Sequence, residues 1–213
     1  MNASCVEVSK GTVFVVDDDA SVRRGLSTLF RSAGLDVELF ASAAEMERSL
    51  RAEAANCLVL DVRMPTLNGI EFQEQLAHSN NKIPIIFITG HADVPMTVRA
   101  MKGGAIDFFT KPVDGSAILD AVSVAIDRDR RRRESEDAVA MLQLAFEALT
   151  PREREVMVLV TAGLMNKQIA AEMGLQEITV KIHRGNIMRK MKAKSLPDLV
   201  RMADGIGLRR DAS

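Results

Sequence analysis

The sequence is poor in aromatic residues and in cysteine. Its 213 residues include eight Phe, no Trp, no Tyr and two Cys. Two cysteines are too few for a disulfide framework, which excludes the class of small disulfide-stabilised secreted domains. The cores must therefore be built from Leu, Ile, Val, Met and Ala. We expect Cys57, which precedes an apolar segment, to be a buried thiol that packs as a small hydrophobic side chain.

Long apolar stretches are missing as well. The longest apolar run, Ile83 to Ile88, contains a proline and is far shorter than the roughly 18 residues of a membrane span. The first ten residues lack a basic segment followed by an apolar one, which a secretion signal would need. We therefore expect a cytoplasmic protein that makes no contact with a membrane.

The chain as a whole carries no excess of either charge, since its formal net charge is −1. Taken alone, this value argues against a nucleic-acid-binding protein. The charge is unevenly distributed, however. Residues 1–126 hold 11 Lys and Arg against 16 Asp and Glu, whereas residues 150–213 hold 12 against 7. An acidic part joined to a basic part indicates two domains with different partners, and the basic one suits an anionic partner.

The acidic part alternates between short β-branched segments and helical periodicity. The strand-like segments are 12–16, 37–39, 57–60, 83–88 and 106–109. Five strands that alternate with helices predict a doubly wound, flavodoxin-like α/β fold with five parallel strands. In such a sheet, functional groups lie just beyond the carboxyl ends of the strands.

Polar residues stand at the ends of four of these strands. Asp17 and Asp18 follow the first strand, Asp61 the third, Thr89 the fourth and Lys111 the fifth. The acidic run after the first strand would on its own indicate no more than a helix cap. Carboxylates gathered at one edge repel one another unless a cation lies among them, and their hard oxygen atoms suit Mg²⁺. Together with the hydroxyl and the ammonium group, they predict a site for a phosphoryl group.

A resemblance to the receiver domains of bacterial two-component response regulators is carried by the stretches VFVVDDDASVRRGL, LVLDVRMPTLNGIE, IPIIFITGHADVPMTVRAMKGGAIDFF and TKPV. It implies that Asp61 accepts a phosphoryl group from a sensor histidine kinase. It also implies a site for Mg²⁺ (or Mn²⁺) formed by Asp18, Asp61 and the main-chain carbonyl of Arg63, with Asp17 beside them.

The same resemblance assigns roles to three further residues. Thr89 is expected to hydrogen-bond the phosphoryl group, and Lys111 to pair with it. Phe108, three residues before this lysine, matches an aromatic residue that turns inward on activation. Thr89 and Phe108 would then form a two-state switch.

The C-terminal part predicts helices. Residues 150–153 form a helix start with a capping box, and Asn166 is expected to cap a second helix. Gly174 indicates a tight turn before a third helix over residues 177–191, and Ser195 begins a fourth. Two helices separated by a glycine-bearing turn, of which the second is basic, describe a helix-turn-helix.

The third of these helices is expected to bind DNA. Its predicted buried stripe contains Val180, His183 and Ile187, with the histidine packed in the core. The side away from this stripe and its flanks comprise Lys181, Ile182, Arg184, Gly185, Met188 and Arg189. Lysine and arginine side chains can contact phosphates and guanine edges, and isoleucine can contact a thymine methyl group.

Residues 149–203 resemble the LuxR/NarL-type DNA-binding domain, and their combination with a receiver is similar to the FixJ/StyR-like regulators. The resemblance implies base contacts by Lys181, Ile182 and Gly185 and phosphate contacts by Lys167, Thr179 and Arg189. Gly185 departs from the pattern because it has no side chain and costs a helix interior about 1 kcal/mol relative to Ala. Either the backbone approaches DNA closely there or that base is not read.

The domains are predicted as a receiver over 1–126, a helical linker over 127–149 and a DNA-binding domain over 150–213. No Gly or Pro occurs between Ser116 and Leu149, so one long helix of roughly 50 Å is possible. The basic run at 130–133 indicates an ion-paired, solvated linker, although a further DNA contact is the alternative.

We therefore predict a transcription regulator, not an enzyme, that dimerises when Asp61 is phosphorylated. DNA, a sensor kinase and RNA polymerase are its expected partners. One alternative is a Mg²⁺-dependent phosphohydrolase, but Arg63 stands where that enzyme would need a second acid/base Asp. Another is a DNA-binding regulator controlled by protein contacts without phosphorylation.

Overall fold

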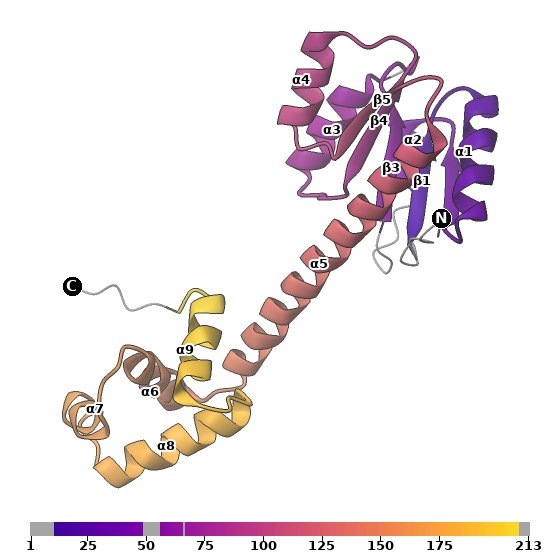
Figure 1. Cartoon of the computed structure of the whole chain (residues 1–213). Helices are drawn as coiled ribbons and strands as arrows, with labels where there is room; N and C mark the ends of the chain where they lie inside the picture. Colours follow the sequence, from indigo (N-terminus) through magenta and orange to yellow (C-terminus); the bar gives the residue numbers. More distant parts are fainter. Residues whose placement is uncertain (1–10, 49–55, 66, 209–213) are drawn as a thin grey trace. The chain divides into compact units, whose positions relative to one another are not determined.

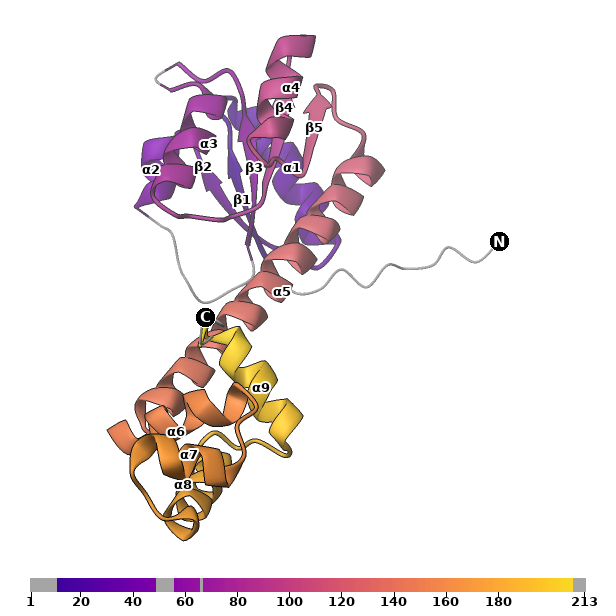
Figure 2. The same cartoon turned by 90° about the vertical axis from the view of Figure 1, so that its left-hand side faces the viewer.

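The computed structural model describes residues 11–48, 56–65 and 67–208, so Cys5 lies outside the described residues. The chain divides into two compact units, residues 1–132 and 133–213. The first contains a sheet between layers of helices, and the second is helical (Figures 1 and 2). Within the described residues, no helix is both long and apolar enough to cross a membrane.

The first unit is built on a parallel sheet of five strands. These are β1 (Thr12–Val16), β2 (Asp36–Phe40), β3 (Asn56–Asp61), β4 (Ile85–Thr89) and β5 (Asp107–Thr110). Their order is β2-β1-β3-β4-β5, and all neighbouring pairs are parallel. The central strands are buried on both faces, as continuous runs of Val, Ile and Leu require. The predicted doubly wound fold is confirmed.

Helices cover both faces of this sheet. They are α1 (Ala20–Ser32), α2 (Ala43–Glu47), α3 (Gly69–His78), α4 (Val94–Lys102) and α5 (Gly115–Glu147). Because strand side chains alternate between faces, Phe14 and Leu58 pack with α2, α3 and α4, whereas Val13 and Val59 pack with α1 and the first part of α5. Cys57 is fully buried on the second face, as predicted, and burial raises the pKa of its thiol.

The boundaries of β2 to β5 differ from the predicted ones by one residue, except at the start of β4, where the difference is two. The apolar run from Ile83 predicts a strand at that residue, but β4 begins at Ile85. Pro84 has no N–H to donate to a neighbouring strand, although its carbonyl accepts a hydrogen bond from the N–H of Leu58 at 2.9 Å. The regular strand therefore begins only after Pro84.

Helix α5 runs without a break from Gly115 to Glu147. Its first half packs through a stripe of buried side chains, the last of which is Asp129. Beyond this residue most of its side chains are exposed, and two arginines of the basic run pair with aspartates of the same helix. Arg132 lies 2.5 Å from Asp129, and Arg130 lies 3.3 Å from Asp127. The continuous, ion-paired helix is thus as the sequence predicts.

The second unit contains the remaining helices. They are α6 (Pro151–Thr161), α7 (Asn166–Met173), α8 (Glu177–Lys190) and α9 (Leu196–Gly205). The capping box at Thr150 and the cap at Ser195 are confirmed. The predicted cap at Asn166 is wrong, because the N-cap is Met165, whose N–H donates to the Gln168 side chain at 2.8 Å. Gly174 makes the turn before α8 with a φ of +65°.

Candidate functional site

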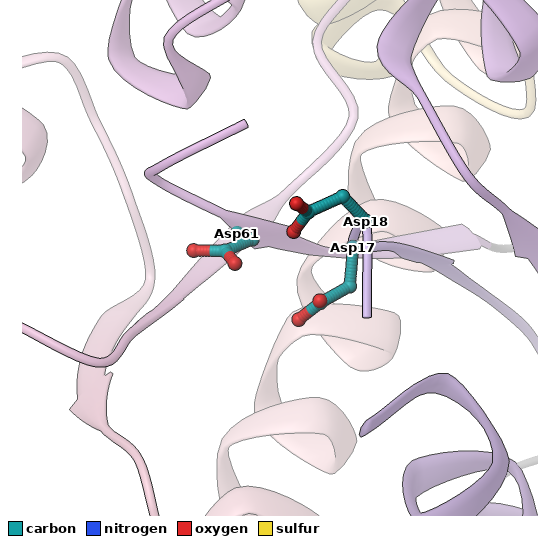
Figure 3. A group of neighbouring side chains, drawn as sticks. All are labelled: Asp17, Asp18 and Asp61. Atoms are coloured by element: carbon teal, nitrogen blue, oxygen red, sulfur yellow. The ribbon is translucent and has the colours of Figure 1, made fainter. Parts of the chain in front are cut away.

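Three carboxylates meet at the carboxyl ends of β1 and β3. Asp17 and Asp18 follow β1, and Asp61 ends β3, the strand that pairs with it. One oxygen atom from each of the three lies within 4.8 Å of the others (Figure 3). Asp17 and Asp61 are buried, whereas Asp18 is exposed. The arrangement presents a cluster of hard oxygen atoms that is open to solvent on the side of Asp18.

Lys111 supplies the positive charge for this cluster. Its Nζ lies 2.6 Å from Asp17 Oδ2 and 2.7 Å from Asp61 Oδ2, and its N–H donates to the carbonyl of Thr89 at 2.8 Å. Burial raises the pKa of Asp17, although the hydrogen bond from the lysine opposes this effect. Burial would lower the pKa of Lys111, but hydrogen bonds to the two carboxylates outweigh it, and that pKa is raised.

The consecutive aspartates after β1 have different roles. Asp17 Oδ1 accepts a hydrogen bond from the N–H of Asp19 at 2.9 Å. Asp19 in turn caps α1 by accepting from the N–H of Ser21 at 2.7 Å. The helix-cap interpretation therefore holds for Asp19, whereas Asp17 and Asp18 belong to the carboxylate cluster.

The backbone of Asp61 leaves no space for a side chain at position 69. The N–H of Arg63 donates to Asp61 Oδ1 at 3.0 Å, and the Arg63 side chain is exposed. Gly69, the first residue of α3, packs so closely that a Cβ there would lie 2.4 Å from the Asp61 main-chain oxygen. The sequence does not predict this role of Gly69. A glycine at a helix start is compatible with close packing of the backbone against another segment, but the sequence does not show that this segment contains Asp61.

Thr89 and Phe108 lie on neighbouring strands, β4 and β5. The Thr89 side chain is buried, and its hydroxyl donates to the carbonyl of His91 at 3.1 Å. The Phe108 ring is partly buried, with its centre 6.1 Å from that of Phe87. The hydroxyl thus sits at the same strand-end edge as Asp61, and a half-buried aromatic ring follows on the adjacent strand.

Helix α8 carries the predicted DNA-binding residues. Val180 and Ile187 are buried, as predicted, and His183 is partly buried with an Nδ1 atom that has no hydrogen-bond partner in the described part of the chain. The exposed residues among those predicted to contact DNA are Lys167, Lys181, Ile182, Gly185 and Arg189, whereas Thr179 is partly buried. Met188 faces the interior instead, since it packs against the helical core.

Two basic side chains of α8 are engaged inside the domain. The Arg184 guanidinium donates to the Asn166 side chain at 2.6 Å and so joins α8 to α7. Lys190 Nζ donates to Glu153 Oε2 at 2.7 Å and to the carbonyl of Ala148 at 3.2 Å. The sequence places both cations in a basic patch but does not indicate these partners, which come from other helices.

Comparison with known proteins agrees with this two-part organisation. Residues 13–123 match the family model described as the response regulator receiver domain. Residues 147–203 match that of the bacterial regulatory proteins of the luxR family.

Relatives match over nearly the whole chain. Nodulation protein W of Bradyrhizobium diazoefficiens is 58% identical, over 94% of this chain and 88% of its own length. The solved structure of the response regulator StyR is 51% identical with a TM-score of 0.83, covering 91% of this chain and 98% of that one. Full-length FixJ from B. japonicum is 40% identical with a TM-score of 0.56, covering 94% and 98%. The chain therefore belongs to the two-component response regulators that combine a receiver domain with a LuxR-type DNA-binding domain.

Proposed function

We propose that this protein accepts a phosphoryl group on Asp61 from a sensor histidine kinase and thereby controls DNA binding by α8. The observation that carries the proposal is the shared ion pair of Lys111 with Asp17 and Asp61. One ammonium group between two buried carboxylates, beside an exposed third, is suited to a transferring phosphoryl group. A location in the cytoplasm, where DNA and the kinase are accessible, is part of the proposal.

The residues present fit a Mg²⁺ or Mn²⁺ ion. Asp17, Asp18 and Asp61 offer oxygen atoms within 4.8 Å of one another, and such hard ligands are those that Mg²⁺ prefers. We assign Asp18, Asp61 and the main-chain carbonyl of Arg63 as its protein ligands, with Asp17 beside them. When bound, the ion supplies positive charge that offsets the charge on the phosphoryl oxygens.

The transfer step is a displacement at phosphorus. A carboxylate oxygen of Asp61 forms a bond to phosphorus while the bond from phosphorus to the imidazole nitrogen of the donor breaks, and the imidazole leaves. Hydrogen bonds from Lys111 and from the N–H of Arg63, one to each oxygen, fix the orientation of the Asp61 carboxylate. Lys111 then stays close to the phosphoryl oxygens as their counter-charge.

Phosphorylation provides the energy for a conformational switch. The new group adds nearly two negative charges at neutral pH and competes with the carbonyl of His91 for the hydroxyl of Thr89. When Thr89 moves toward the phosphoryl group, Phe108 takes up the vacated space. The changed face comprises α4, β5 and α5, and we propose that it forms a homodimer whose DNA-binding domains occupy adjacent half-sites.

On DNA, we assign base contacts to Lys181 and Ile182, with the bare backbone of Gly185 facing the groove. Phosphate contacts are assigned to Lys167, Thr179 and Arg189. Arg184 acts through Asn166 as a positioning residue that sets the angle between the two helices. RNA polymerase is the further partner that a transcription regulator requires.

The test combines phosphorylation with DNA binding. Mg²⁺ with acetyl phosphate should promote both dimerisation of the full chain and its binding to duplexes selected from a random library. Asp61→Asn should abolish both effects. Asp36→Asn, an exposed aspartate at the start of β2, is the matched control and should behave like the wild type.

Two other functions predict different results. A phosphohydrolase would release many phosphates per chain, but the position two residues after Asp61 is held by Arg63 rather than by a carboxylic acid, which favours a single transfer. A regulator controlled by protein contacts alone would bind DNA equally well as the wild type and as Asp61→Asn. We therefore propose a regulator that is not an enzyme.

A further inference from the structure

Helix α8 carries an apolar strip on its exposed side. Ile178 and Ile182 are each 58% exposed, and Gly185 follows one turn later with no atom within 4 Å of the position of a Cβ. With about 3.6 residues per turn, these three residues align on one side of the helix. They lie opposite Val180 and Ile187, which are buried in the helical core.

Folding of the domain does not explain the strip. Neither isoleucine belongs to the buried core, and β-branched isoleucine is a weaker helix former than the Lys, Glu or Gln usual on exposed positions. Hydrogen-bonding side chains lie beside the strip, at the exposed Lys181 and the partly buried Asn186, or beyond its end, at the exposed Arg189. The centre of the exposed side therefore offers methyl groups and no side-chain donor or acceptor.

This chemistry matches one feature of DNA. In the major groove, base edges present hydrogen-bond donors and acceptors together with one apolar group, the C5-methyl of thymine. A side chain without polar atoms discriminates there by burying that methyl group, and it would leave unpaired the donors and acceptors of other bases. The missing side chain at Gly185 lets the groove edge approach the same side of the helix.

We propose, on the basis of the function above, that Ile178 and Ile182 read the C5-methyl groups of two thymines in each half-site. Four residues of helix span about 6 Å, and successive bases of a strand are about 3.4 Å apart. With α8 lying along the major groove, the two methyl groups would therefore lie about two base pairs apart. Lys181 and Arg189 contact the polar edges and phosphates around them.

The experiment removes the methyl groups one at a time. The full chain, treated with Mg²⁺ and acetyl phosphate, is used to select duplexes from a random library. Each thymine of the selected half-site is then replaced by deoxyuridine, which lacks nothing but the C5-methyl. Two positions should each lose affinity by about fourfold, the ratio expected for one buried methyl group, and the other positions should be unaffected.

Alanine variants of the two isoleucines show which isoleucine contacts which thymine. Ile178→Ala and Ile182→Ala should each become insensitive to deoxyuridine at one of the two positions. Leu144→Ala, which truncates a side chain of α5 that is 61% exposed, is the control and should keep both responses. Each readout is a ratio of affinities for two duplexes measured on one preparation, so partial unfolding of a variant does not alter it.

Two results would overturn the proposal. In one, no thymine of the selected sequence responds to deoxyuridine. In the other, both alanine variants keep the full response. Failure of the proposed function looks different. Without DNA binding, the library would yield no enriched sequence, and without control by phosphorylation, Asp61→Asn would enrich the same sequence as the wild type.

Discussion

A side chain at Gly69 would collide with the backbone of Asp61, the proposed phosphoacceptor. Its Cβ would lie 2.4 Å from the main-chain oxygen of Asp61 and 3.1 Å from the Cα of Val62. The N–H of Gly69 also donates to the carbonyl of Val62 at 2.9 Å. The start of α3 is thus packed directly against the end of β3, and this packing fixes the position of Asp61 in the carboxylate cluster.

Gly69→Ala should therefore impair phosphorylation. Because the obstacle is backbone rather than a flexible side chain, Asp61 must shift, at a cost of about 1–3 kcal/mol in unfolding free energy. We expect phosphorylation by acetyl phosphate to slow by about tenfold, as a misplaced nucleophile would cause. Gly25→Ala in α1, where no atom lies within 4 Å of the Cβ position, is the control and should gain stability. Equal phosphorylation rates in both variants would contradict the role of Gly69.

Gly185→Ala should change protein stability and DNA affinity in opposite directions. Outside the neighbouring backbone of α8, no atom of the described chain lies within 4 Å of the added methyl group, so the variant should unfold with a free energy about 1 kcal/mol higher. If the backbone of α8 approaches the groove closely, the same methyl group must weaken DNA binding. We expect higher thermal stability together with lower affinity in a binding titration. Unchanged affinity would mean that the base opposite this residue is not read.

Arg184→Ala tests the link between the helices of the helix-turn-helix. The change leaves Asn166 without its 2.6 Å partner and should lower stability by about 1–3 kcal/mol. DNA affinity should fall by a similar factor for every sequence. Asn166→Ala should have the same effect, and the two changes should not add. Arg189→Ala, by contrast, should weaken binding without loss of stability. A change in sequence preference in Arg184→Ala would show that Arg184 reads bases.

The helical domain should lose stability in acid through Glu153. Burial alone would raise the pKa of Glu153, but hydrogen bonds from Lys190 and Thr150 outweigh it and lower this pKa from 4.5 to about 2. A carboxyl whose pKa is lower in the folded state stabilises the fold above its unfolded pKa. The stabilisation is lost as the pH falls from 4.5 toward 2.

Urea unfolding at several pH values, followed by circular dichroism, checks this prediction. Glu153→Gln should lower the free energy of unfolding by about 2 kcal/mol at neutral pH, and the difference from the wild type should shrink below pH 4.5. The control is Glu155→Gln, because Glu155 pairs with Arg152 at the surface, where an ion pair contributes about 0–1 kcal/mol. A pH-independent difference for Glu153→Gln would exclude the ionised carboxylate as its cause.

The sequence predicts the carboxylate cluster more completely than it predicts the contacts made by α8. Asp17, Asp61 and Lys111 each end or follow a strand, and parallel order brings such positions to one edge of a sheet whatever the side-chain details. On α8 the partners depend on tertiary packing. Arg184 and Lys190 count equally as surface cations in the sequence, but helices α7 and α6 supply carbonyl and carboxylate oxygens that engage them.

The same reasoning explains the errors at particular residues. Asn is a residue type that often caps helices, but the side-chain oxygen of Asn166 accepts from Arg184, eighteen residues away. At the start of α7, the side-chain oxygen of Gln168 accepts from the N–H of Met165 instead. Met188 lies near the edge of the exposed side of α8, where a small rotation of the helix decides whether a side chain packs inward. Periodicity alone does not fix that rotation.

Phosphorylation of Asp61 is tested most directly by the mass of the intact protein after treatment with Mg²⁺ and acetyl phosphate. We predict one added phosphoryl group per chain, carried by Asp61, sensitive to hydroxylamine as an acyl phosphate is, and absent from Asp61→Asn. Asp36→Asn should be labelled as fully as the wild type. Labelling that persists in Asp61→Asn, or a wild-type chain that takes up no phosphoryl group, would contradict the assignment of Asp61 as the phosphoacceptor.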